Sequence, residues 1–242
     1  MIGLLMLRSE DDILGSVLNY NAPLVDAFYV LDGTVPNTKS RPLCERWLSC
    51  RGYWTDDELP ERYGTVPRDG WREWLYRNAV IDFGYDNWFV LMHGDEVWTI
   101  SPAQAAAEHP DADGLVFHLP VYFPREEWDE TAHPLDQLRW SLGPGWPELR
   151  MFRGGERVGY DVTQHFNVTP RGIGRIADTR HAIKHYPFRS PTQQRARAAQ
   201  HAESGFDPDN YRHILDRDEV VWSDAMIARW QRQRCWRDLR CE

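Results

Sequence analysis

The strongest indication of the fold lies at the start of the chain, in the stretch Ile2-Gly3-Leu4-Leu5-Met6-Leu7-Arg8-Ser9-Glu10-Asp11-Asp12. Residues 2–8 form a continuous apolar run, which predicts a buried strand. Ser9, followed three residues later by Asp12, has the spacing of a capping box and predicts that a helix begins there. A second apolar strand follows over Asp26–Leu31. Strand, helix and strand within about thirty residues are typical of a parallel βαβ unit, so the sequence predicts an α/β fold.

The rest of the chain continues to alternate helical and strand patterns. Residues 33–69 are predicted to be an elaborated connection, and loops are predicted to dominate residues 124–148. The apolar periodicity predicts helices over 41–50, 69–83, 101–108 and 191–204 and near 221–239, and strands over 87–92 and 115–123 and near 149–152.

Composition excludes several classes of protein. The 242 residues are 42% hydrophobic and 27% charged, as in an ordinary soluble globular chain. The mean hydropathy is -0.62 and no apolar run approaches the length of a membrane span. The apolar N-terminus lacks a basic segment and a cleavage site, so we expect a cytoplasmic protein. The net charge of -9 argues against general nucleic-acid binding, although the C-terminal third is mildly basic and could contact phosphates locally.

Cysteine spacing leaves a zinc site open. Cys44 and Cys50 are separated by five residues, and so are Cys235 and Cys241. This gap is longer than the usual spacing of zinc ligands, so free thiols are the default expectation.

Acidic residues follow two of the predicted strands. Asp32 comes after the strand 26–31, and Asp95-Glu96 comes after the strand 87–92. Parallel sheets bind ligands at the carboxyl ends of their strands, and carboxylates there suit Mg²⁺ or Mn²⁺ shared with a diphosphate. The alternative is that Asp32 and Asp95 only cap turns. The first turn has no glycines, which argues against a dinucleotide-binding site.

Four segments occur in an order typical of one enzyme family. Leu5–Leu14 is an apolar strand followed by Arg-Ser-Glu-Asp-Asp-Ile-Leu, and Val30–Thr38 contains Asp-Gly-Thr and Asn-Thr. Arg77–Glu96 contains Arg-Asn and later His-Gly-Asp-Glu, and Lys184–Pro191 contains His-Tyr-Pro-Phe-Arg-Ser-Pro. Together they resemble the nucleotide-sugar-dependent glycosyltransferases of the GT-A fold, particularly the family 2-like group. That group has Lys-Asn-Glu-x-Asp-Ile-Leu, Asp-x-Gly-Ser-Thr-Asp-x-Thr, Asp-x-Asp and His-Tyr-x-x-Arg-Ser-Pro in these places.

The resemblance implies a GT-A domain over residues 1–190, with a Rossmann-like, mostly parallel sheet flanked by helices, and a helical C-terminal extension over 191–242 packed on it. It implies a metal-dependent, inverting glycosyltransferase that moves a sugar from a nucleoside diphosphate sugar to a hydroxyl acceptor. The acceptor stays open among a glycan, a lipid, a protein, a small metabolite and a hydroxylated DNA base. The alternatives are a nucleotidyltransferase, which usually needs a Gly-rich phosphate loop, and a non-catalytic nucleotide-sugar-binding module.

The resemblance also implies roles for single residues. Asp95 and His185 would hold Mn²⁺ or Mg²⁺, which bridges the two phosphates of the donor. Asp32 would hold the base or ribose, and Arg77 would contact the diphosphate or Asp95. His93 stands where the family has the first Asp of Asp-x-Asp, so metal binding rests on Asp95. The full set of expected nucleotide-sugar contacts is Arg8, Glu10, Asp32, Arg77, Asn78 and His93.

An inverting enzyme needs one carboxylate as the general base for the acceptor hydroxyl. We favour Asp161 and Asp136, because both lie in loop-like stretches between the segments that carry the metal ligands. The other candidates are Glu126, Glu127 and Glu148. Tryptophans that border these loops are candidates for an acceptor platform, because flat apolar rings stack on sugars and bases; they are Trp98, Trp128, Trp140 and Trp146.

Overall fold

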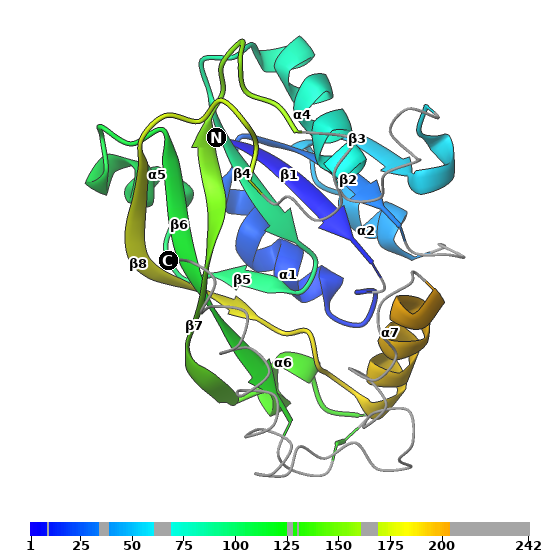
Figure 1. Ribbon diagram of the computed structural model, residues 1–242. Coiled ribbons are helices and arrows are strands. Elements are labelled where there is room, and N and C mark those ends of the chain that lie inside the picture. The colour runs from blue at the N-terminus through cyan, green and yellow to red at the C-terminus, as the bar shows by residue number, and fades with distance from the viewer. Residues whose placement is uncertain are drawn as a thin grey trace. The chain divides into compact units, whose positions relative to one another are not determined.

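The computed structural model describes residues 1–8, 10–33, 39–60, 69–124, 128–129, 131–160 and 169–203. The strands form one eight-stranded sheet in the order β3-β2-β1-β4-β7-β6-β8-β5 (Figure 1). The chain divides into two compact units, residues 1–120 with 144–185 and residues 121–143 with 186 onward. The predicted division at residue 190 stays a prediction.

One half of the sheet is parallel. β1 (Ile2–Leu7) pairs with β2 (Ala27–Asp32) on one side and with β4 (Trp88–His93) on the other. β2 also pairs with β3 (Cys50–Thr55). β1 and β2 are buried along almost their whole length, as expected for parallel strands covered on both faces. The βαβ unit predicted from the opening of the chain is therefore confirmed.

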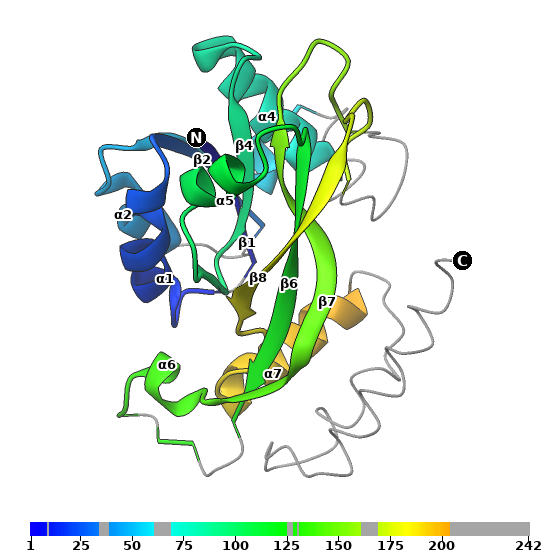
Figure 2. The ribbon, with the colours of Figure 1, turned by 90° about the vertical axis from the view of Figure 1, so that its left-hand side faces the viewer.

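Helices cover both faces of this parallel half (Figure 2). One core cluster packs alternate residues of β1 against Leu14 and Leu18 of α1 (Leu14–Asn21), together with residues of α2 (Ser40–Glu45) and α5 (Pro102–Glu108). The other cluster packs the remaining residues of β1 against α4 (Asp69–Phe83). The predicted α/β class is confirmed: the sheet is mixed, parallel in its N-terminal half, and helices flank it.

Two predicted boundaries in the N-terminal part are corrected. α1 begins at Leu14 rather than directly after Ser9, because the Glu10 carbonyl accepts hydrogen bonds from Ile13 and Leu14 and forms a turn first. The predicted helix 41–50 ends at Glu45, and Cys50 already begins β3. Two short 3₁₀ helices, Ala22–Leu24 and Asp56–Glu58, complete this region.

The other half of the sheet contains antiparallel pairs. β7 (Trp140–Arg153) pairs with β4, and β5 (Glu96–Trp98) pairs with β8 (Ile176–His185). β6 (Gly114–Phe123) lies between β7 and β8 in the sheet. The sequence predicts β6, but it gives only residues 149–152 of β7 and neither β5 nor β8.

Local irregularities explain why these strands are missed. Gly145 of β7 has a φ of +85°, and a Cβ there would lie 2.1 Å from the carbonyl carbon of Leu119. Arg180 of β8 also has a positive φ, 56°. β8 is mostly polar and partly exposed. Such strands lack the apolar alternation that sequence patterns detect.

The second unit contains α6 (Pro134–Gln137) and α7 (Pro191–Glu203). The Ser190 hydroxyl accepts a hydrogen bond from the Gln193 amide at 3.1 Å and caps α7. The fully buried Arg189 donates to the Tyr186 carbonyl at 2.8 Å, and its own amide donates to Gln193 at 3.1 Å. The helix predicted from residue 191 is confirmed, and the one predicted near 221–239 lies outside the described residues.

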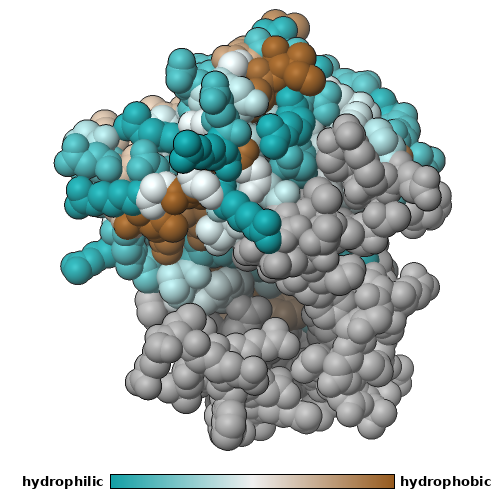
Figure 3. All heavy atoms as spheres, turned by 45° about the horizontal axis from the view of Figure 1, so that its top comes forward, coloured by the Kyte–Doolittle hydropathy of each residue, from teal (hydrophilic) through white to brown (hydrophobic). Residues whose placement is uncertain are grey.

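In the described part of the chain, large apolar side chains reach the surface at few places. Leu48 and Ile81 are the most exposed of them, at 96% and 79%. On the face drawn in Figure 3, apolar patches are small and bordered by hydrophilic residues. Among the described residues, no helix combines the length and the apolarity that a membrane span requires.

Candidate metal and nucleotide-sugar site

The parallel register brings the predicted acidic residues to one edge of the sheet. Leu7 of β1 is opposite Asp32 of β2, and Met6 of β1 is opposite His93 of β4. The segments that follow these strands therefore begin side by side. They carry Arg8 and Glu10, Asp32-Gly33, and His93-Gly94-Asp95-Glu96.

Asp32 is fully buried and accepts a hydrogen bond from the Tyr53 hydroxyl of β3. The next residue, Gly33, donates its amide to the Leu7 carbonyl at 3.0 Å. A Cβ at Gly33 would lie 2.2 Å from the ring of Trp71, so a larger residue there would require this ring to move. Tyr53 thus orients the carboxylate of Asp32. The sequence does not predict this role, because its pattern over residues 33–69 predicts a connection and not the strand β3.

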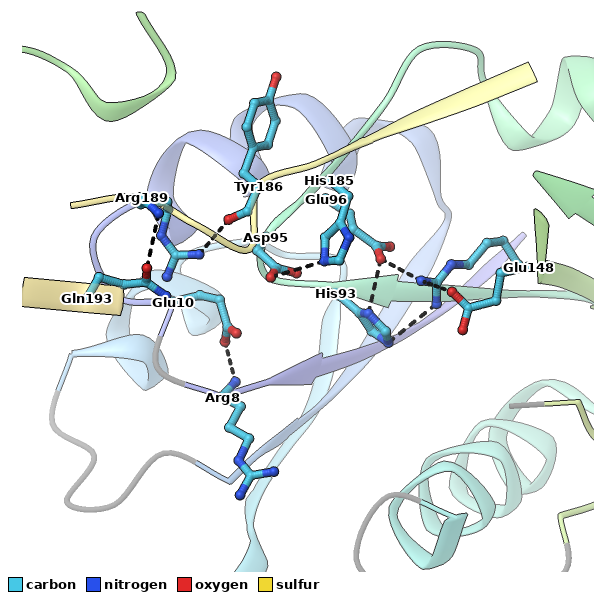
Figure 4. A network of polar contacts seen from close by, with 11 residues as sticks. Arg8, Glu10, His93, Asp95, Glu96, Glu148, His185, Tyr186, Arg189 and Gln193 are labelled. Carbon is cyan, nitrogen blue, oxygen red and sulfur yellow. Dashed lines mark hydrogen bonds and ion pairs between the residues drawn. The ribbon is translucent and has the colours of Figure 1, made fainter. Parts of the chain in front are cut away.

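Glu10 lies in the turn after β1 and is 6% exposed. Its carboxylate accepts a hydrogen bond from the Arg8 amide (Figure 4). A Cβ on Gly94 would lie 3.0 Å from the Cβ of Glu10, which shows how closely the turns after β1 and β4 approach. In this arrangement the Glu10 carboxylate stabilises the first turn.

Asp95 and His185, the two predicted metal ligands, lie together. His185 Nε2 is 3.4 Å from Asp95 Oδ2 (Figure 4). Asp95 belongs to the turn between β4 and β5, whereas His185 ends β8 and is the ladder partner of Glu96. Both side chains are largely buried, at 4% and 12% exposure. The ring of Trp146 contacts His185 edge-on, with 5.5 Å between ring centroids.

A buried ionic network lies beside this pair. Arg150 of β7 donates from Nη2 to Glu96 Oε1 at 2.5 Å and to Glu148 Oε2 at 2.8 Å. Its Nη1 is 3.4 Å from His93 Nε2, and His93 Nδ1 is 3.1 Å from Glu96 Oε1. Arg150 and Glu96 are 1% and 0% exposed. The sequence did not predict a role for Arg150, although an arginine inside the apolar strand 149–152 was a signal of a buried charge partner.

The network fixes the protonation of its members. Burial raises the pKa of Glu96, but the charge of Arg150 and the contact with His93 outweigh burial and lower the pKa to about 2. Burial lowers the pKa of His93, Arg150 lowers it further, and Glu96 opposes this only in part. Burial also disfavours the charge of Arg150, but Glu148 and Glu96 raise its pKa above the ordinary value. At neutral pH Glu96 is therefore ionised and His93 is neutral.

The donor set fits a divalent cation. Ligand atoms of His93, Asp95 and Glu96 lie within 4.8 Å of one another. Asp95 Oδ2 and His185 Nε2 are 3.4 Å apart, and neighbouring ligands around a metal with bonds of about 2.1 Å are about 3.0 to 3.4 Å apart. His185 Nδ1 is buried, with no hydrogen-bond partner among the described residues. Of these residues, Asp95 and His185 can hold Mn²⁺ with one oxygen and one nitrogen ligand.

The predicted residues Arg77 and Asn78 of α4 make other contacts. Arg77 Nε donates to Glu73 Oε1 at 2.6 Å, and Glu73 also accepts from the amide of Tyr160 at 2.7 Å. Asn78 donates to the carbonyl of Trp74 at 2.8 Å. The bonds of Arg77 and Asn78 lie within α4, and only the bond from the Tyr160 amide to Glu73 links this helix to another part of the chain. A role of Arg77 at the diphosphate stays a prediction.

The candidate general bases and the tryptophans of the predicted acceptor platform lie in different surroundings. Asp136 is exposed in the first turn of α6, and Glu148 is held by Arg150. Trp98 is a core residue, because it is 6% exposed and packs against Phe117, so its predicted place in an acceptor platform is wrong. Trp140 is 47% exposed. Three other base candidates lie outside the described residues: Asp161, Glu126 and Glu127.

Comparisons with solved structures find similar chains. S. aureus TarS 1–349 is 13% identical over 89% of this chain and 69% of that chain, with a TM-score of 0.47. HddC from Yersinia pseudotuberculosis is 11% identical over 64% of this chain and 75% of that chain, with a TM-score of 0.35. A mycobacterial protein is 14% identical over 86% and 75% of the two chains, with a TM-score of 0.32. No family model and no curated protein matches the sequence. The function proposed below therefore rests on the residues of the site.

Proposed function

We propose that the chain is a metal-dependent glycosyltransferase that moves a sugar from a nucleoside diphosphate sugar to a hydroxyl acceptor. The observation that carries the proposal is the approach of His185 Nε2 to Asp95 Oδ2, at 3.4 Å, beside the carboxyl end of β4. These two residues come from segments that are far apart in the sequence. Both segments match places where the GT-A glycosyltransferases that the sequence resembles hold their metal.

Asp95 and His185 would bind the cation, Mn²⁺ or Mg²⁺. When bound, the cation supplies Lewis-acid stabilisation of the charge that develops on the leaving nucleoside diphosphate. Asp32, oriented by Tyr53, would accept a hydrogen bond from the base or ribose. Buried, pre-oriented carboxylates suit this task because they do not have to reorganise when the donor binds.

The candidates for the general base are still carboxylates that lie in loop-like stretches of the chain. Asp136 and Asp161 are our candidates, and inversion requires that the base lie on the face of the sugar opposite the leaving group. Glu148 is a poorer candidate, because one of its oxygens already accepts a hydrogen bond from Arg150.

A non-catalytic nucleotide-sugar-binding module is the second candidate function. One observation favours it: His93 stands where the related enzymes have an aspartate, and its ring nitrogens contact Glu96 and Arg150. A binding module and a transferase would both bind the donor, so only turnover separates them. Donor hydrolysis and transfer to a panel of acceptors are the measurements that do so.

The first test is thermal stabilisation by nucleoside diphosphates and nucleotide sugars, with and without Mn²⁺. The proposal predicts stabilisation by at least one nucleotide that depends on the metal. Asp95→Ala should abolish it. Asp111→Ala is the matched control, because Asp111 is 83% exposed and contacts only an exposed arginine at 3.9 Å in the described chain. Stabilisation that is absent in the wild type, or equal in Asp95→Ala, would contradict the proposal.

A further inference from the structure

Arg150 carries a positive charge that is buried within the protein, and a buried charge needs partners that stabilise it. It is 1% exposed and is among the largest fully buried side chains of the described residues. Its guanidinium contacts residues on both sides of Asp95 in the sequence: His93 at 3.4 Å and Glu96 at 2.5 Å. Buried as it is, Arg150 is placed to act on the protein's own turn rather than on a ligand in solvent.

The chemistry of the guanidinium determines the state of His93. An arginine nitrogen can only donate a hydrogen bond, so His93 Nε2, 3.4 Å from Arg150 Nη1, must be the acceptor. His93 Nδ1 then carries the proton and donates to Glu96 Oε1 at 3.1 Å. Both ring nitrogens are thus engaged within the protein. While these bonds hold, neither nitrogen can bind a metal.

The same contacts hold the turn that carries Asp95. His93 precedes Asp95 and Glu96 follows it, and Arg150 binds both. Between them, the Gly94 amide donates to the Met6 carbonyl at 3.3 Å, and the missing Cβ of Gly94 lets Glu10 and Leu7 pack against it. The turn is therefore fixed before and after Asp95 by groups other than a metal.

We propose that Arg150 is a positioning residue, which holds His93 and Glu96 so that Asp95 is presented to the metal while His93 serves as scaffold and not as ligand. This inference rests on the proposed metal-dependent function. Arg150 acts through Asp95 and does not itself contact the metal or the diphosphate. It makes the conformation of the turn independent of metal binding.

Electrostatics alone predicts that removing Arg150 strengthens metal binding, whereas positioning predicts that it weakens metal binding. A fixed positive charge near Asp95 repels a cation, so its loss would tighten metal binding. Its loss would also release His93 and Glu96 as additional ligands. Positioning predicts weaker binding, because Asp95 would no longer be held toward His185. The sign of the change in metal affinity therefore separates the two accounts.

The experiment measures Mn²⁺ affinity from the paramagnetic resonance signal of free Mn²⁺, without nucleotide. Wild type is compared with Arg150→Met and with Arg150→Lys, which keeps the charge but loses the forked geometry. Arg153→Met is the matched control, because Arg153 is also on β7 but donates to the carbonyls of Ala112 and Pro110. We expect Mn²⁺ to bind at least about tenfold more weakly to Arg150→Met, as for other residues that orient metal ligands, with an intermediate loss in Arg150→Lys and no change in Arg153→Met.

A second readout is independent of the metal. Nitrogen-15 resonances of His93 at a fixed neutral pH should show the neutral Nδ1–H tautomer in the wild type and its loss in Arg150→Met. If Arg150→Met does not fold, Arg150→Met/Glu96→Gln removes the buried charge of both partners and is measured instead.

Equal or tighter Mn²⁺ binding in the folded Arg150 variants would overturn the inference and leave the proposed function intact. A His93 ring with its proton on Nε2, or one that binds Mn²⁺, would also overturn the inference. A wild-type protein that does not bind Mn²⁺ would overturn the metal-dependent function and this inference together.

Discussion

Asp32 ends the parallel strand β2 and Asp95 follows the parallel strand β4, whereas Arg150 and His185 lie on the antiparallel strands β7 and β8. The parallel half gives the position of the site, since parallel strands end at the same edge. The antiparallel half contains the buried Arg150 that contacts the turn, and we propose that it adds one metal ligand, His185. On this proposal, the acidic strand end forms a metal site only together with a residue of the antiparallel half.

The largest expected effect comes from removing the metal ligand that we propose for the antiparallel half of the sheet. His185→Ala removes the ligand that β8 supplies and leaves Asp95 in place. We expect transferase activity to fall by about 1000-fold, since metal stabilisation of the leaving group is worth several kcal/mol. The rate of sugar transfer at saturating donor and Mn²⁺ measures it. His181→Ala is the control, because His181 pairs with Glu108 of α5 at 2.7 Å; equal rates in the two variants would show that β8 contributes no ligand.

The next effect concerns a polar bridge between α1 and β5. Asn21 is 1% exposed; its amide nitrogen donates to the Glu96 carbonyl at 2.6 Å, and its oxygen accepts from the Trp98 amide at 3.2 Å. Asn21→Ala leaves two buried backbone groups without these partners, so we expect a loss of about 2–4 kcal/mol of stability. Urea unfolding checks this. A loss below about 0.5 kcal/mol would mean that β5 does not depend on α1.

A smaller effect is expected within the parallel half. Tyr53→Phe removes the hydroxyl that donates to the buried carboxylate of Asp32. One lost hydrogen bond to a charged group costs about 1.5–3 kcal/mol, and we expect nucleotide affinity to fall with it, while Mn²⁺ affinity without nucleotide stays unchanged. Calorimetric titration of nucleotide and metal separates the two. A loss of Mn²⁺ affinity in Tyr53→Phe would show that Asp32 influences metal binding as well as nucleotide binding.

The smallest effect concerns the thiols at the edge of the parallel half. Burial raises the pKa of Cys50 to about 11 and also raises that of Cys44. Because the thiolate is the reactive form, both thiols should be mostly protonated at pH 8 and should alkylate more slowly than a free cysteine. The rate at Cys50 should rise as the pH approaches 11. Mass spectrometry of the alkylated peptides measures both rates, and rapid labelling at pH 8 would contradict the burial of these thiols.

The sequence predicts β1, β2 and β4 of the parallel half, because they are apolar runs, but it misses β3. It also predicts that no helix continues past His185, because Tyr-Pro follows, and His185 indeed ends a strand. It cannot give Arg150, Tyr53 or the tautomer of His93. Those depend on β3, β7 and β8, whose glycines, positive φ angles and polar faces hide the strand pattern. Contacts between strands that are far apart in the sequence leave little local signal in one sequence.

The most direct test of the central claim is the anomalous scattering of Mn²⁺ in crystals soaked with Mn²⁺ and a nucleoside diphosphate. The account predicts an anomalous peak about 2.1–2.2 Å from both Asp95 Oδ2 and His185 Nε2, with His93 still bonded to Glu96 and Arg150. A peak bound by His93, or no peak beside Asp95 and His185, would contradict it.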